Sequence, residues 1–148
     1  MKIVAHLISA ALVRFMCAYA FKVKFQGVKL CDITTTQSKN RNSRIEMIQL
    51  ALGMIFELNP ILFARVKKHI KFVCVSDIVE VGVYNLQTKL IQFPKEATTS
   101  EVVDDVLYFA NLAELRSRGV NVNENQKRLS ELIVSLVKRQ MSDNQKNG

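Results

Sequence analysis

The stretch IKFVCVSDIVEVGVYNLQTKLIQF, residues 70–93, indicates the fold class of this chain of 148 residues. Residues 70–78 are rich in β-branched and aromatic side chains, as is typical of a strand. Two further short apolar runs flank residues 85–88, a pattern that predicts a β-hairpin, and Pro94 ends it. The stretch therefore predicts a small sheet of about three strands, paired mainly antiparallel.

Two helices and a basic strand are predicted before this sheet. SRIE at residues 43–46 is a capping-box pattern that opens a helix. Asn-Pro at residues 59–60 ends it and begins the next, because Asn is favoured as an N-cap and Pro at the first helical position. FKVKFQGVKLCDI, residues 21–33, alternates apolar and charged residues, which predicts a strand with a turn at residues 26–27. Residues 34–42 are polar and predict a loop.

Two more helices are predicted after the sheet. TTSE at residues 98–101 is another capping-box pattern, and Gly119 supplies the stop of the helix that it opens. Asn123 caps a last helix with an apolar stripe, and the polar tail from Ser142 is expected to be mobile. The predicted fold class is α+β, with the sheet packed on four helices and preceded by an apolar helix. The expected divisions are an apolar helix at 1–21, a basic strand and loop linker at 22–42, the α+β domain at 43–141 and the tail at 142–148.

The net charge of +8 belongs to the first half of the chain. Residues 22–71 hold ten Lys or Arg against three Asp or Glu, whereas residues 95–148 hold eight of each sign. Such a basic half suits an anionic lipid surface, a nucleic acid or an acidic protein. The candidate contacts with an anionic surface are Lys22, Lys24, Lys29, Lys39, Arg41, Arg44, Lys67 and Lys68.

Residues 3–21, IVAHLISAALVRFMCAYAF, are almost all apolar, and three interpretations of them compete. They suit a membrane anchor, because nineteen residues just span about 30 Å of hydrocarbon. They also suit a signal peptide cleaved near Ala20, which would make the protein secreted, or a helix of a soluble cytoplasmic core. The basic run that follows favours the anchor: a single pass with the C-terminal domain on the cytoplasmic side.

Few side chains of this chain suit catalysis. Its histidines are His6 and His69, and it has no HExxH motif, Gly-rich phosphate loop or nucleophile elbow. His69 is expected at a helix C-terminus, as a capping or surface residue rather than a base. Asp104 and Asp105 are adjacent, so they do not share a helix face; they complement the helix dipole.

The three cysteines do not form a metal-binding pattern. Cys17, Cys31 and Cys74 include no CxxC pair, and their spacing matches neither a zinc finger nor an iron–sulfur site. A disulfide between Cys31 and Cys74 is one interpretation, and buried thiols are the other. No cofactor and no metal are expected.

The run from residue 51 to residue 136 resembles a bacterial family of small, often membrane-anchored zinc metallopeptidases with a zincin-like fold. The matching stretches are LALGMIFELNPILFARVKKHI, KFVCV, VGVYNLQTKLIQF, VLYFANLAELRSRGV and NENQKRLSELIVSLVKRQ. In that family a helix ends in an Asp/Asn-Pro turn, and a hairpin is followed by an HExxH helix and a helix that bears a glutamate. The resemblance covers more than half of the chain.

The resemblance implies a metal site that has been lost. The zinc histidines would fall on Tyr108 and Leu112 and the catalytic glutamate on Phe109, while Glu131 stands where the third ligand would be. Tyrosine and leucine cannot replace imidazole, and phenylalanine cannot act as a base for zinc-bound water. Packing explains the same residues equally well, because Tyr108 and Leu112 suit the core of an amphipathic helix and Glu131 an exposed helix position.

These observations predict a non-catalytic, membrane-associated domain of pseudo-metallopeptidase type with a structural or protein-interaction role. The alternative is a soluble basic module that binds nucleic acid or an acidic partner through residues 22–71. Nucleic acid is the less favoured ligand, because Lys24–Phe25 and Lys71–Phe72 alternate with the period of a half-buried strand, which places the aromatic rings inside.

Overall fold

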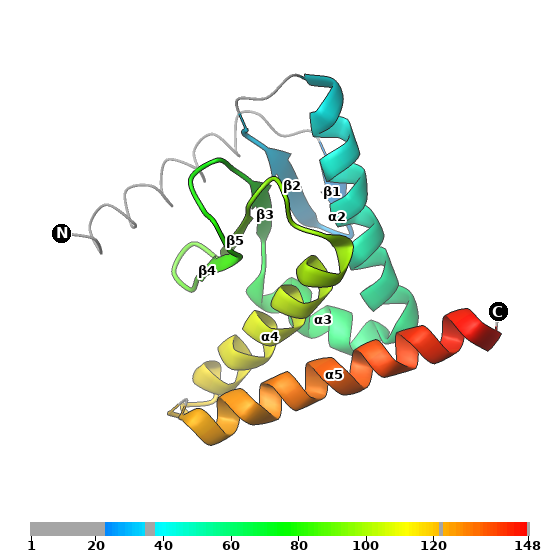
Figure 1. The fold of residues 1–148 in the computed structure, drawn as a ribbon. Helices are drawn as coiled ribbons and strands as arrows, with labels where there is room; N and C mark the ends of the chain where they lie inside the picture. Colours follow the sequence, from blue (N-terminus) through cyan, green and yellow to red (C-terminus); the bar gives the residue numbers. More distant parts are fainter. Residues whose placement is uncertain (1–22, 35–37, 122, 148) are drawn as a thin grey trace.

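A computed structural model describes residues 23–34, 38–121 and 123–147 as an α+β domain (Figure 1). The α+β class and the four helices of the described part confirm the prediction, whereas the apolar segment at 3–21 lies outside the described residues. In chain order the elements are β1 (Val23–Phe25), β2 (Val28–Asp32), α2 (Ser38–Leu58), α3 (Pro60–His69), β3 (Phe72–Val75), β4 (Val83–Asn85), β5 (Leu90–Phe93), α4 (Thr99–Ser117) and α5 (Glu124–Asn147).

The described strands form one five-stranded mixed sheet in the order β1-β2-β3-β5-β4. β2 and β5 both run parallel to the central β3, and only the edge strands β1 and β4 are antiparallel to their neighbours. The prediction of about three mainly antiparallel strands is therefore wrong. The reason is the connection between β2 and β3. The helices α2 and α3 return the chain to the end of the sheet at which β2 began, and β3 therefore runs in the same direction as β2.

Local capping and turn signals are confirmed at most positions. The side chain of Asn59 accepts a hydrogen bond from the backbone N–H of Leu62, and that of Thr98 accepts one from Glu101. Pro60 is the first residue of α3. Gly119 follows the end of α4 with a φ of 77°, a conformation that glycine adopts without steric cost. These signals depend on neighbouring residues alone, which is why the sequence predicts them well.

Two predicted helix boundaries are wrong. α2 begins at Ser38 rather than at Ser43, and α5 continues to Asn147 through the tail expected to be mobile from Ser142. Neither segment contains a Gly or Pro to interrupt the helix, so its polar residues extend it. Val23–Phe25 and Val28–Asp32 are strands joined by a turn at residues 26–27, which confirms the strand and turn predicted there, and their apolar side chains pack into the core.

The helices cover one face of the sheet (Figure 1). That face carries the alternate side chains of β2, β3 and β5, and these join α2, α3, α4 and α5 in one core. The opposite face carries a smaller buried cluster of Cys31, Cys74 and Leu90, flanked by Ile33 and Phe72. The Sγ atoms of Cys31 and Cys74 lie 3.2 Å apart, so the residues are neighbouring thiols and not a disulfide.

Candidate binding cleft between α4 and α5

A cleft of about 360 Å³ lies between α4 and α5. Tyr108 and Glu131, two of the four positions where the resemblance places a lost metal site, line it together. They belong to different helices, and the antiparallel packing of α5 on α4 brings them together (Figure 1). The remaining lining residues are Asp104, Asp105, Val134 and Ser135.

The other two positions, Phe109 and Leu112, do not line the cleft. The Phe109 ring stacks on Tyr84 of β4 with centroids 5.7 Å apart, and it meets the edge of Tyr108 at 5.4 Å. Leu112 is buried. Both side chains therefore pack α4 against its neighbours, and within the described part of the chain no three His, Cys, Asp or Glu residues lie together as metal ligands.

The cleft is acidic. The Nζ of Lys138 lies 3.1 Å from each carboxylate oxygen of Asp104, and it is the one cation that the described residues bring to a carboxylate of the lining. Burial, followed by the charges of Asp104 and Glu101, raises the pKa of Asp105 above its ordinary value. Three carboxylates against one lysine leave this cleft with an excess of negative charge.

Gly82, which precedes β4, lies close to Asp105 of α4. A Cβ atom at this position would overlap the Asp105 Oδ2 atom and would lie 3.2 Å from a ring carbon of Phe93. A side chain at this position would therefore require the Asp105 carboxylate to move away. Gly82, which directly precedes the edge strand β4, therefore lies next to Asp105, one of the residues that line the acidic cleft.

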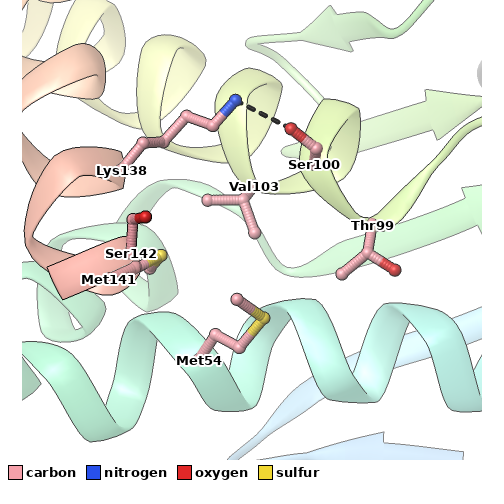
Figure 2. Close-up of a pocket in the computed structure, with 7 residues that line it drawn as sticks. All are labelled: Met54, Thr99, Ser100, Val103, Lys138, Met141 and Ser142. Atoms are coloured by element: carbon pink, nitrogen blue, oxygen red, sulfur yellow. Dashed lines mark hydrogen bonds between the residues drawn. The ribbon is translucent and has the colours of Figure 1, made fainter. Parts of the chain in front are cut away.

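A second cavity, of about 280 Å³, lies where α2, α4 and the C-terminal part of α5 meet (Figure 2). Met54, Val103 and Met141 give it a largely apolar lining, and its one titratable side chain is Lys138, which donates to Ser100 Oγ at 2.7 Å. It offers no acid or base pair for chemistry. Thr99 and Ser142 complete the lining.

Glu114 connects α4 to the end of α3. Its Oε2 lies 2.5 Å from His69 Nε2 and 3.2 Å from Lys68 Nζ, and its Oε1 accepts from Arg118 Nε at 3.2 Å. The His69 hydrogen bond, followed by that of Lys68, lowers the pKa of Glu114 to about 2. The carboxyl group is therefore ionised near neutral pH, where it is a poor general acid or base.

His69 is buried, so the prediction that it is a surface residue is wrong. His69 ends α3, and its imidazole faces Glu114 rather than solvent. Sequence reasoning missed Glu114 altogether. The available signal was its spacing, because Glu114 continues the buried stripe of Val103, Leu107 and Ala110 on α4, where a carboxylate needs a partner.

The predicted basic contacts do not form a single surface. Arg44 pairs with Asp32, with Nε 2.5 Å from Oδ2, and Lys68 pairs with Glu114. These two cations are therefore engaged within the domain. Lys22 and the side chains of Lys39 and Arg41 lie outside the described residues.

Five lysines lie at the end of the sheet where β2, β3 and β5 begin: the predicted contacts Lys24, Lys29 and Lys67, together with Lys71 and Lys89. Lys71 accepts a backbone hydrogen bond from Lys29 and donates one to Lys89, which lines up these three residues across adjacent strands. Lys24 faces Lys29 in the β1–β2 ladder, and Lys67 lies against the β1–β2 turn. Among the described residues none of the five forms an ion pair with a carboxylate. Lys89 was missed because it lies beyond the basic half of the sequence.

Comparisons of this chain with protein-family models, with curated proteins and with solved structures give no match.

Proposed function

We propose that this chain is a non-catalytic, pseudo-metallopeptidase-like domain that holds a segment of a partner protein in the cleft between α4 and α5. The observation that carries the proposal is the position of Tyr108 and Glu131, which line one cleft although they belong to different helices. A zincin-like relationship accounts for their convergence, since two positions of the lost metal site would then face the same space. The side chains now present suit binding rather than hydrolysis.

The chemistry of the cleft favours a segment with a cationic side chain. Asp105 and Glu131 line the cleft, and neither forms an ion pair with a described residue. A lysine or arginine of a partner would neutralise them, and burial of Asp105 strengthens that interaction. The edge strand β4, which follows Gly82 beside Asp105, offers backbone groups to which an extended segment could add as a further strand.

Membrane association is the second part of the proposal, and it rests on the apolar sequence of residues 3–21. Among the helices that the structure describes, none is long and apolar enough to cross a bilayer. An anchor at the N-terminus would hold the domain at the cytoplasmic face. Pelleting with membranes that survives a carbonate wash supports an anchor, because that wash releases peripheral proteins held by charge; release by the wash contradicts it.

Two measurements on the full chain test the cleft. Metal analysis of the purified protein is expected to find no stoichiometric zinc, and zinc near one per chain that disappears in Glu131→Ala would contradict the proposal. Titration with a lysine-containing extended peptide is expected to show binding that Glu131→Gln and Asp105→Asn each weaken by about tenfold. Glu124→Gln is the matched control, because Glu124 is an exposed residue of α5 away from the cleft lining. Equal binding by all variants would contradict the proposal.

The alternative function, a basic module for an acidic partner or a nucleic acid, is favoured by the lysines at the amino ends of β2, β3 and β5. It predicts binding to a polynucleotide or polyglutamate that weakens steeply with salt. Lys71→Gln and Lys89→Gln should weaken that binding. Lys95→Gln should not, because Lys95 is an exposed lysine just after β5, beyond the opposite end of that strand. Salt-independent binding, or an equal effect of all three substitutions, would count against this alternative.

A further inference from the structure

A small cavity of about 80 Å³ lies between α3, α4 and α5, apart from the acidic cleft. One water molecule takes about 30 Å³ in the liquid, so the cavity has room for a group larger than a single water. Leu115 and Ile133 form its apolar side. Its polar lining residues are Arg65, Asn111, Glu114, Arg118 and Ser130.

Asn111 is the residue that points to a ligand. It is only 3% exposed, and its Oδ1 accepts a hydrogen bond from Arg65 Nη1 at 3.0 Å. Its Nδ2 has no hydrogen-bond partner among the described residues. A buried N–H donor without an acceptor costs about 1–3 kcal/mol, and such groups are rare in native proteins. The cavity beside Asn111 therefore lacks an acceptor.

The charges around the cavity favour a negatively charged acceptor. Lys68 and Arg118 each lie 3.2 Å from the one carboxylate of the lining, that of Glu114, and Arg65 lines the same cavity. Arg65 bonds to the neutral amide of Asn111, and Arg118 uses its Nε–H on Glu114, which leaves further guanidinium donors of both residues for a ligand. Glu114 does not repel an anion strongly, because its charge is already offset by its cationic neighbours.

We propose that this cavity binds a small oxyanion, either inorganic phosphate or the carboxylate of a larger molecule. Its oxygens accept from Asn111 Nδ2 and from the guanidinium groups of Arg65 and Arg118, with the Ser130 hydroxyl as a further donor. Guanidinium groups match the geometry of both anions. Arg118 is 65% exposed, so the cavity opens to solvent on its side and the anion enters there.

The test measures the binding of defined anions to the full chain at constant ionic strength. Calorimetric titrations with phosphate, sulfate and acetate, against a chloride background, are expected to show saturable binding of at least one oxyanion. Preference for phosphate and sulfate identifies a tetrahedral anion, and preference for acetate identifies a carboxylate. Absence of saturable binding by all three overturns the proposal and leaves water as the content of the cavity.

Substitutions locate the anion. Arg65→Gln and Arg118→Gln should each weaken binding by about tenfold or more, because each removes a charged donor. Arg139→Gln is the matched control, since Arg139 is an exposed arginine of α5 that does not line the cavity. Asn111→Asp should abolish binding while the protein stays folded, because it replaces the Nδ2 donor by an acceptor and gives Arg65 an ion pair. Binding that survives Asn111→Asp, or that Arg139→Gln weakens equally, overturns the proposal.

Discussion

Glu114 and His69 are separated by 45 residues of sequence, yet Glu114 Oε2 lies 2.5 Å from His69 Nε2 in the buried contact between α4 and α3. Glu114→Gln keeps the shape of the side chain and removes its charge, so the hydrogen bonds from His69, Lys68 and Arg118 weaken together. We expect a loss of about 1–3 kcal/mol in the free energy of unfolding, measured by urea denaturation.

The matched control is Glu131→Gln. Glu131 is exposed, and its side chain forms no ion pair within the described part of the chain. Its substitution should change the free energy of unfolding by less than about 0.5 kcal/mol. An equal loss in both variants would show that Glu114 stabilises the protein only through its contribution to the net charge, and not through its hydrogen bonds.

The stability that Glu114 provides should depend on pH. The pKa of Glu114 is lowered from 4.5 to about 2 in the folded chain, first by the hydrogen bond from His69. Its contribution is therefore complete above the unfolded value of 4.5 and is lost as the pH falls to about 2. Denaturation of the natural chain and of Glu114→Gln across this range should give two curves that converge at low pH. If the difference in unfolding free energy between the two proteins stayed constant down to the lowest pH, the pKa of Glu114 would be the same in the folded and unfolded states.

The close approach of Gly82 to Asp105 predicts that Gly82→Ala destabilises the domain. The added Cβ would displace the Asp105 carboxylate, the flexible end of its side chain, and would lie 3.2 Å from a ring carbon of Phe93, so we expect a loss of about 1 kcal/mol. The loss should be smaller in the Asp105→Ala background, where the carboxylate is absent. Thermal denaturation of the single and double variants measures this coupling.

Gly53→Ala provides a control of opposite sign. Gly53 lies inside α2, and a Cβ there would meet its nearest neighbour, a Phe25 ring carbon, at 3.8 Å. The substitution should stabilise the protein by roughly 0.5–1 kcal/mol, because alanine is the better helix former. If both glycine substitutions destabilise equally, the contact between Gly82 and Asp105 is not the cause.

The thiols of Cys31 and Cys74 should react slowly with a soluble thiol reagent such as dithionitrobenzoate. Both side chains are at most 1% exposed, so reaction requires the sheet to open. In a Cys17→Ser chain we expect labelling at least roughly a hundredfold slower than that of Ser135→Cys, an exposed position on α5. Rapid labelling of the Cys17→Ser chain would show that this face of the sheet is open to solvent.

The sequence predicted local structure better than strand partners. Thr98, Asn59 and Gly119 mark helix ends through hydrogen bonds or torsions that involve only nearby residues. In the parallel pairing of β2 with β3, Cys31 lies opposite Cys74, although two helices separate these strands in the sequence. An alternating pattern of apolar and polar residues does not indicate which strand will be the partner. A signal for it existed, because FVCV in β3 is apolar on both faces, as is typical of a central parallel strand.

The candidate sites were predicted unevenly for the same reason. Tyr108 and Glu131 came from the resemblance, and the structure places both in one cleft. The cavity with Asn111 and Arg65 could not be predicted, because its residues come from three helices whose packing angles no local pattern encodes. Glu114 is intermediate, since its place on the inner stripe of α4 was visible in the sequence although its partner was not.

The central position of β3 affects how the chain folds as it is synthesised. β2 has no parallel neighbour until residues 72–75 have left the ribosome, about forty residues after β2 itself. At about 5–20 residues per second, the β1–β2 hairpin waits a few seconds with one of its long edges unpaired. In that interval the nascent chain offers an open edge and the apolar side chains of Val28 and Leu30 to other chains. Yield of this protein should therefore depend on chaperones and on the speed of translation through α2 and α3.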